Sequence, residues 1–119
     1  MKNDREEYKF SGIPTFMRSP YVDVDQLDEY DVGVLGVPLD YGVSYREGAK
    51  YGPRSIREHS HWDRVTEDEF HDLETGDTLI SQSLKLADVG DVHIYPGDAE
   101  KTNDEISRAV AEIRRRAFP

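Results

Sequence analysis

The sequence has no cysteine, only five lysines, one tryptophan and no long apolar run. Without cysteine there is no disulfide framework, no thiol nucleophile and no cysteine-ligated zinc. The amino terminus, Met-Lys-Asn-Asp-Arg-Glu-Glu, is charged and has no apolar stretch behind it. No later run is long enough to span a bilayer. We therefore expect a soluble cytoplasmic protein that does not associate with membranes.

Cations are also scarce relative to acids. The chain has 15 lysines and arginines against 25 aspartates and glutamates, so its formal net charge is −10. Nucleic-acid phosphates and anionic lipids both require a basic surface, so we expect neither as a partner. A salt-adapted surface and ordinary acidic solubility both remain compatible with this excess. The 119 residues suffice for one small domain and not for two.

Two short apolar segments predict strands. Residues 31–38 form a continuous β-branched run, which is typical of a parallel strand covered on both faces. Residues 83–89 carry a second apolar pattern that ends in a glycine turn. A short helix is predicted between them at residues 53–60, and strand, helix and strand favour a right-handed βαβ unit. The fold class is therefore α/β.

Residues 98–116 predict the longest helix. Thr102-Asn-Asp-Glu105 has the spacing of a capping box, although Asp98 and Glu100 leave room for a start one turn earlier. Arg114-Arg115-Arg116 lie where the negative end of the helix dipole is expected. Five apolar residues fall on one face at helical spacing: Ile106, Ala109, Val110, Ile113 and Ala117.

The remaining segments predict less regular structure. Residues 1–30 are expected to form a leader arm, and residues 31–119 the α/β domain. Within the arm, the irregular apolar pattern indicates an ordered segment lying over a surface, and residues 23–30 leave room for a helical turn. Residues 61–82 are acidic and turn-rich, and indicate a surface excursion. The expected anchors of the arm are Phe10, Phe16 and Met17.

The loop between the first strand and the first helix is rich in glycine. Gly36, Gly42, Gly48 and Gly52 are spaced by six, six and four residues, which matches neither a Walker motif nor Gly-x-Gly-x-x-Gly. Its serines lack the flanking glycines of a nucleophile elbow. Pro53 suits the start of a helix because its missing N–H needs no partner there. Such a loop lies at the carboxyl edge of a parallel sheet, where open α/β folds bind ligands.

Three segments together resemble one family. The run 36–57, Gly-Val-Pro-Leu-Asp-Tyr-Gly-Val-Ser-Tyr-Arg-Glu-Gly-Ala-Lys-Tyr-Gly-Pro-Arg-Ser-Ile-Arg, is followed by Asp-Val-Gly-Asp-Val at 88–92, and both resemble the amino-terminal part of the ureohydrolases. Residues 10–20 resemble the leader of agmatinase-like members. This family includes agmatinase, arginase and guanidinobutyrase. The resemblance implies the beginning of a three-layer α/β/α arginase-like parallel sheet, left incomplete by this chain.

The resemblance also implies a chemistry. Family members hydrolyse a guanidino compound to urea and an amine with two manganese ions, held by Gly-Gly-Asp-His, Asp-Ala-His-x-Asp and Asp-x-Asp motifs. Neither Gly-Gly-Asp-His nor Asp-Ala-His-x-Asp occurs here, and the chain stops about where the strand leading to the first would begin. We expect the amino-terminal portion of an agmatinase-like metallohydrolase, without metal ligands or a cofactor of its own and inactive alone.

Two other functions remain open. In the first, the chain is a non-catalytic subunit or remnant that assembles with a partner chain. In the second, it is a small α/β binding module. An incomplete sheet has unpaired edges and exposed apolar surface, so we expect a marginal chain, completed by another chain or by homo-oligomers. The partner implied for the complete enzyme is a guanidino small molecule.

The candidate site residues lie on the loop and at the end of the second strand. No residue is predicted to be catalytic. The substrate-rim candidates are Asp40, Tyr41, Ser44, Tyr45 and Arg46, a position that the resemblance implies. For Arg46, Arg54 and Arg57 we favour a structural role, because a planar guanidinium can tie the loop to nearby carboxylates through paired hydrogen bonds.

Asp88 and Asp91 lie three residues apart around Gly90. They suit either a cation or the capping of a turn, and capping is favoured. The four histidines lack the i, i+4 spacing of a helical metal pair, and surface or partly packed positions are expected of them: His59, His61, His71 and His93.

Overall fold

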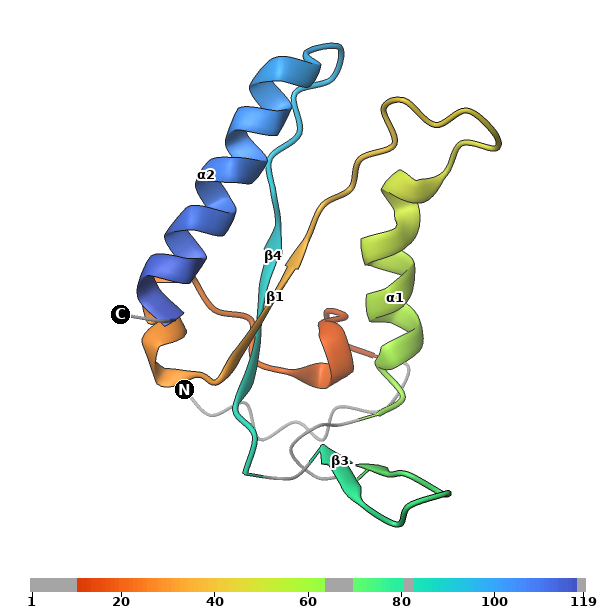
Figure 1. The fold of residues 1–119 in the computed structure, drawn as a ribbon, viewed down its shortest axis with the longest axis vertical. Helices are drawn as coiled ribbons and strands as arrows, with labels where there is room; N and C mark the ends of the chain where they lie inside the picture. Colours follow the sequence, from red (N-terminus) through yellow and green to blue (C-terminus); the bar gives the residue numbers. More distant parts are fainter. Residues whose placement is uncertain (1–10, 64–69, 81–82, 118–119) are drawn as a thin grey trace.

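The structure, a computed structural model, describes residues 11–63, 70–80 and 83–117 and has an α/β fold (Figure 1). Three short 3₁₀ helices accompany the strands and helices: η1 (Phe16–Arg18), η2 (Val24–Glu29) and η3 (Ala49–Tyr51). The strands and α-helices follow the order β1 (Val32–Gly36), α1 (Gly52–Ser60), β2 (Phe70–His71), β3 (Thr78–Ile80), β4 (Leu86–Asp91) and α2 (Ala99–Ala117).

β1 and β4 pair in parallel, which confirms the predicted pairing of the two apolar segments. The register matches Val32 with Leu86 and Gly36 with Asp91. β1 covers Val32–Gly36, which is shorter than the predicted span 31–38, and Pro38, which has no N–H to donate to a ladder, lies outside it. β4 begins later than predicted and continues through Asp91. The crossover between these strands contains α1, as predicted.

The leader arm adds to the outer edge of β4. The amide of Asp88 donates to the carbonyl of Pro20 at 2.9 Å, and the amide of Val22 donates to the carbonyl of Asp88 at 3.0 Å. Tyr21 thereby forms a parallel bridge with Asp88. The arm predicted to lie over a surface therefore also pairs with the sheet at one residue. Within the described residues, β1 therefore has the sheet edge without a strand partner.

Two apolar clusters lie on opposite faces of the sheet. Met17 and Leu86 form one cluster, against which Phe16 and Val34 pack. Leu27 and Ala87 belong to the other, together with Val22, and Ile113 of α2 packs against it. Because successive side chains of a strand point to opposite faces, Leu86 and Ala87 place these clusters on the two sides of β4. The arm supplies buried residues to both faces, and Met17 is one of its predicted anchors; Phe10 lies outside the described residues.

A glycine allows the close approach of β1, β4 and α1. A Cβ at Gly36 would overlap the carboxylate of Asp91 and lie 2.9 Å from the Cβ of Pro53. Any side chain at this position would therefore push β1 away from the end of β4 or from the first turn of α1. The glycine keeps the carboxyl ends of the two strands together.

α2 begins at Ala99, so the predicted capping box at 102–105 is wrong. The Asp98 carboxylate accepts the amide of Lys101 at 2.9 Å and serves as the cap. Thr102 is fully buried in the first turn, where its hydroxyl donates to the Asp98 carbonyl at 2.8 Å and accepts the amide of Tyr95 at 3.1 Å. The earlier start that the sequence left open is the observed one.

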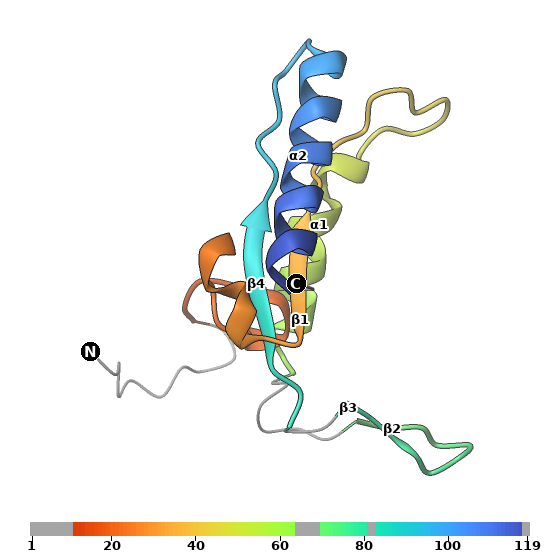
Figure 2. The ribbon, with the colours of Figure 1, turned by 60° about the vertical axis from the view of Figure 1, so that its left-hand side comes forward.

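The excursion contains an antiparallel hairpin that sequence analysis did not predict. β2 and β3 pair around a turn in which the Asp72 carboxylate accepts the amide of Glu74 at 2.8 Å. The hairpin lies at the end of the molecule opposite the loop that follows β1 (Figure 2). Residues 64–69 and 81–82 of the predicted excursion lie outside the described residues. None of the helices in the described part of the chain is long and apolar enough to cross a membrane.

Candidate functional site

The loops that follow β1 and β4 leave the same edge of the sheet (Figure 1). The strands are parallel, so their carboxyl ends meet there. The first loop, residues 37–48, is called the rim loop below, and the second, residues 92–98, leads into α2. Open α/β sheets bind ligands outside the carboxyl ends of their strands. All five rim candidates are on the rim loop, which makes this edge the candidate site.

The rim loop is closed on itself by Asp40. One carboxylate oxygen of Asp40 accepts the amide of Gly48 at 3.1 Å and lies 4.0 Å from the Lys50 ammonium. The Asp40 side chain is only 11% exposed, so its carboxylate faces the loop and not the solvent. Gly48 has a φ of 135°, a backbone conformation that residues with a side chain rarely adopt. These contacts give Asp40 a role in shaping the loop.

Tyr41 joins the rim loop to the loop before α2. Its hydroxyl donates to the carbonyl of Tyr95 at 3.1 Å and accepts the amide of Gly97 at 3.2 Å. Both backbone groups belong to the segment between β4 and α2. Tyr95 is in turn held by Thr102, and the Lys101 ammonium lies 4.1 Å from the centre of its ring. The two loops at the carboxyl edge are therefore connected through one side chain.

The tip of the rim loop carries the remaining candidates. Ser44, Tyr45 and Arg46 are exposed, with Tyr45 at 76%. The Arg46 guanidinium lies 5.2 Å from the centre of the Tyr45 ring, a cation–π distance. Arg46 forms no ion pair with any carboxylate of the described residues. The prediction that Arg46 ties the loop to carboxylates is therefore wrong, and its guanidinium is left available to a ligand.

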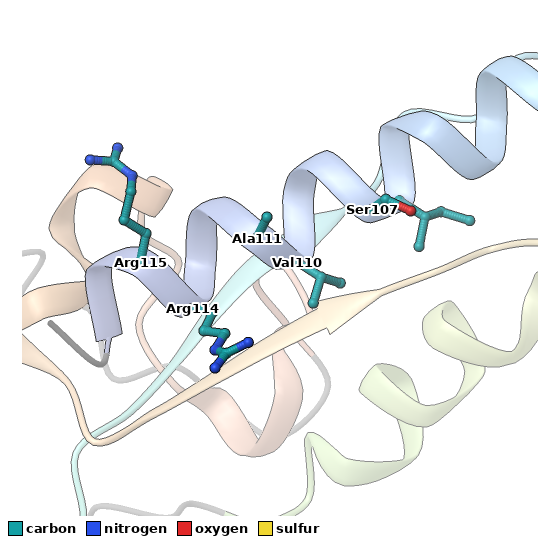
Figure 3. A pocket seen from close by; sticks show the side chains of 6 residues that line it. Ser107, Val110, Ala111, Arg114 and Arg115 are labelled. Carbon is teal, nitrogen blue, oxygen red and sulfur yellow. The ribbon is translucent and has the colours of Figure 1, made fainter.

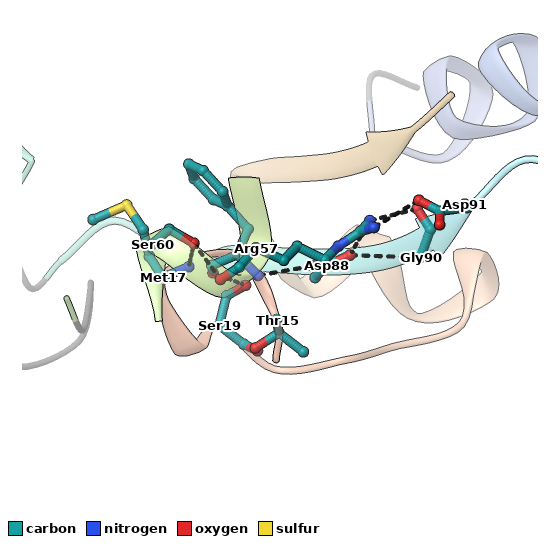
Figure 4. A network of polar contacts seen from close by, with 9 residues as sticks. Thr15, Met17, Ser19, Arg57, Ser60, Asp88, Gly90 and Asp91 are labelled. Atoms are coloured by element: carbon teal, nitrogen blue, oxygen red, sulfur yellow. Dashed lines mark hydrogen bonds and ion pairs between the residues drawn. The ribbon is translucent and has the colours of Figure 1, made fainter. Parts of the chain in front are cut away.

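Arg57 on α1 binds both aspartates at the end of β4 (Figure 4). Its Nε and Nη2 donate to the two oxygens of Asp88 at 2.8 and 3.0 Å, and its Nη1 donates to Asp91 at 2.6 Å. Nη2 also donates to the carbonyl of Gly90 at 2.9 Å. Asp88 further accepts the amides of Phe16 and Gly90 at 2.8 and 2.9 Å. These contacts are of the kind predicted for Arg57 and Asp88, and the network joins the arm, α1 and β4.

Arg54, one turn earlier on α1, behaves differently. Its side chain is 85% exposed, and its Nε lies 3.5 Å from Glu58 on the same helix. Arg54 thus makes a surface pair within α1 and does not tie the rim loop to a carboxylate, contrary to prediction. Such exposed pairs contribute little to stability.

The network shifts the ionisation of its members. Burial raises the pKa of the Asp88 carboxyl, but hydrogen bonds from Arg57 and from the amides of Phe16 and Gly90 outweigh it and hold the pKa below its usual range. The hydrogen bond to Asp88 raises the pKa of the Arg57 guanidinium, while burial opposes that change. Both groups are therefore charged at neutral pH, as the ion pair requires.

This lowered pKa predicts a specific pH dependence. The unfolded pKa of an aspartate is about 3.9, so the stabilising contribution of Asp88 is fully present above that value and is lost as the pH falls through it toward the folded pKa. We expect the free energy of unfolding to fall more steeply between about pH 5 and pH 2 in the wild type than in Asp88→Asn. Urea unfolding across this range measures both slopes. Equal slopes for wild type and Asp88→Asn would contradict the prediction.

The histidines of the described residues are dispersed. His61 is buried, which differs from the surface or partly packed position expected of it, and its Nε2 lies 3.1 Å from the carbonyl of Ser11. His59 contacts the carbonyl of Ser55, one turn earlier in α1. Within residues 11–63, 70–80 and 83–117, no group of three or more potential metal-ligating side chains comes together. The residues described thus do not fit a dimanganese centre.

This parallel sheet, with a shaped loop at its carboxyl edge, matches a family of α/β enzymes. The model of the arginase family matches residues 30–119, and the chain belongs to this family. Among sequences, it is similar to the guanidinobutyrase of Pseudomonas aeruginosa, with 42% identity over 87 residues. That alignment covers 72% of this chain and 25% of the relative.

Solved structures show the same relationship. A hypothetical agmatinase from Burkholderia thailandensis superimposes with a TM-score of 0.72 and 26% identity over 92% of this chain and 32% of that chain. The proclavaminate amidino hydrolase of Streptomyces clavuligerus gives a TM-score of 0.68 and 32% identity, over 89% and 33% of the two chains. The arginase-like fold is thereby confirmed. The chain spans a third or less of the length of these proteins.

Sequence analysis missed the connection from Tyr41 to Tyr95 and Thr102. Tyr41 is a rim candidate, but it precedes both Tyr95 and Thr102 by more than 50 positions. No local sequence pattern links residues so far apart. The available local signal was Asp98, an aspartate three residues before Lys101, which favours a helix start at Ala99. A helix that begins at Ala99 has Thr102 in its first turn, where the hydroxyl accepts the amide of Tyr95.

Proposed function

We propose that this chain forms the amino-terminal scaffold of an enzyme that hydrolyses a guanidino compound to urea and an amine. The observation that carries the proposal is the parallel pair β1 and β4 with the rim loop at its carboxyl edge, in a chain of the arginase family. The relatives named above include a guanidinobutyrase and an amidino hydrolase, both named for guanidino or amidino substrates. Residues 1–30 serve as the leader and 31–119 as the start of the hydrolase domain.

In this proposal, the scaffold positions the mouth of the active site, and the two manganese ions of the complete enzyme are bound by residues outside those described. The tip residues Tyr45 and Arg46 contact the substrate at the rim, because Asp40 and Tyr41 are engaged within the protein. Tyr45 offers an apolar face, and Arg46 offers a cation that pairs with no carboxylate of the described residues.

The surface around β1 supports a scaffold that is completed by further chain. The edge of β1 has no strand partner in the described residues. Beside it, a small apolar cavity of about 170 Å³ is lined by Val34, Leu35 and Ile56, and Ile56 is 57% exposed. On α2, Val110 is 51% exposed on the side that faces β1 (Figure 3). A further parallel strand along β1 would cover these side chains and complete the ladder.

A chimera tests the proposal. Residues 30–119 replace the matching segment of the Pseudomonas guanidinobutyrase, and urea release from guanidinobutyrate is measured with and without manganese. We expect manganese-dependent turnover from the chimera and none from the isolated chain. A chimera with the size and circular dichroism of the parent enzyme but no urea release would contradict the scaffold function. Manganese-dependent urea release by the isolated chain would contradict the placement of the metal ligands elsewhere.

The same open edge supports a second candidate, a non-catalytic subunit that assembles with a chain carrying the metal motifs or forms homo-oligomers. Here the completing strand comes from a separate polypeptide. Mixing this chain with the guanidinobutyrase from which the matching segment has been deleted distinguishes the two. Activity restored by mixing favours the subunit, whereas activity only from the covalent chimera favours the scaffold of one enzyme.

A further inference from the structure

The Tyr41 hydroxyl both donates and accepts a hydrogen bond, and so connects the rim loop to the loop before α2. It donates to the carbonyl of Tyr95 at 3.1 Å and accepts the amide of Gly97 at 3.2 Å, across a separation of more than 50 residues. Both partners are backbone groups of the loop that leads into α2. Since both partners are backbone groups, Tyr41 is the residue whose side chain makes these two hydrogen bonds.

The partner loop is itself held firmly. The Thr102 hydroxyl, fully buried in the first turn of α2, accepts the amide of Tyr95 and donates to the carbonyl of Asp98. The Lys101 ammonium lies over the Tyr95 ring at 4.1 Å, and the His93 ring meets that ring edge-on at 4.5 Å. Tyr41 therefore attaches the rim loop to a segment that is fixed to the longest helix.

Burial does not explain the position of Tyr41. Its side chain is 44% exposed, and no apolar cluster of the described residues includes it. Two other exposed tyrosines provide a comparison: Tyr45 at 76% and Tyr51 at 66%, whose hydroxyls bind no described residue. What distinguishes Tyr41 is the pair of hydrogen bonds made by its hydroxyl.

We propose that Tyr41 is a positioning residue that holds the rim loop against the loop before α2, and so places Tyr45 and Arg46 at the mouth of the site. Asp40 closes the rim loop on itself, and Tyr41 sets where the closed loop lies relative to the sheet. The two hydrogen bonds from Tyr41 to Tyr95 and Gly97 are called the latch below. The latch is formed by described residues, whereas its effect on substrate binding rests on the proposed function.

Amide hydrogen exchange tests the latch independently of activity. Tyr41→Phe keeps the ring and removes the hydroxyl, so the Gly97 amide loses its acceptor. Both hydrogen bonds of the hydroxyl are lost, so we expect exchange at Gly97 and across residues 40–48 to increase about five- to thirtyfold, the effect of one to two net hydrogen bonds, while exchange in β4 stays unchanged. Tyr51→Phe, the matched control, should alter neither segment. Unchanged exchange at Gly97 in Tyr41→Phe would overturn the latch.

Kinetics of the chimera test the consequence for substrate. Because Tyr41 touches no reacting group, Tyr41→Phe should raise KM for guanidinobutyrate by about three- to tenfold with kcat within about twofold of the parent. Faster exchange with an unchanged KM would overturn the positioning role while leaving the latch. An inactive parent chimera would count against the proposed function alone, since the exchange result stands without turnover.

Discussion

Arg57→Met should lower the free energy of unfolding of this chain more than any other single arginine substitution in its helices. The change leaves Asp88 buried, with 1% of its side chain exposed, and without its cation. Removing one partner of a buried ion pair costs about 3–5 kcal/mol, because the remaining charge is uncompensated. The net stability of a small domain is about 5–15 kcal/mol, so this loss removes a large part of it. Urea unfolding followed by circular dichroism measures the change.

The control for Arg57 lies one turn away on the same helix. Arg54→Met removes a guanidinium that is 85% exposed and makes a surface pair with Glu58, so the free energy of unfolding should change by less than about 0.5 kcal/mol. Arg57→Lys should fall between the two, because an ammonium keeps the charge but cannot reproduce the paired geometry. Equal effects of Arg57→Met and Arg54→Met would show that the network does not stabilise the fold. The chimera provides a second setting for the same comparison.

Leu27→Ala should cost about 2–5 kcal/mol of unfolding free energy. Leu27 is 1% exposed and joins the leader arm to the sheet and to α2, through Val22, Ala87 and Ile113. Its side chain also lies 3.1 Å from the position that a Cβ would occupy at Gly33, so it packs directly on the backbone of β1. Denaturant unfolding measures the loss, and limited proteolysis should show earlier cleavage of the arm.

A second leucine supplies the matched control. Leu73 is fully exposed at the turn between β2 and β3, so Leu73→Ala should leave the free energy of unfolding within about 0.5 kcal/mol of the wild type. The two substitutions remove the same atoms from the side chain and differ only in burial. A small effect at Leu27 would mean that the arm does not contribute to the core, contrary to the packing described here.

Local patterns were sufficient for the regular elements of the site. The β-branched run at 31–38 predicted a parallel strand, since alternation is lost when both faces are covered, and β1 forms within it. The helix after Gly52-Pro53 follows from the preference of proline for a first helical turn. The position of the rim loop at the carboxyl edge then followed from the βαβ connection.

Contacts between distant segments were beyond local patterns. Arg46, Arg54 and Arg57 are chemically identical, and only the packing of α1 against β4 determines that Arg57 reaches the two aspartates. The bridge between Tyr21 and Asp88 likewise depends on where the arm returns to the sheet. The hairpin of β2 and β3 was missed because its strands are too short to show a period.

The sequence by itself determined the α/β class, the order of β1, α1, β4 and α2, and the family, since these depend on residue types at short spacing. Only the tertiary structure decided which charged and hydroxyl groups meet. It assigned Arg57 to a buried network, Tyr41 to the neighbouring loop, and left Tyr45 and Arg46 exposed at the tip. The physical reason is that a side chain's partner is set by the path of the backbone through space, whereas its tendency to form a helix or a strand is set by its neighbours in the chain.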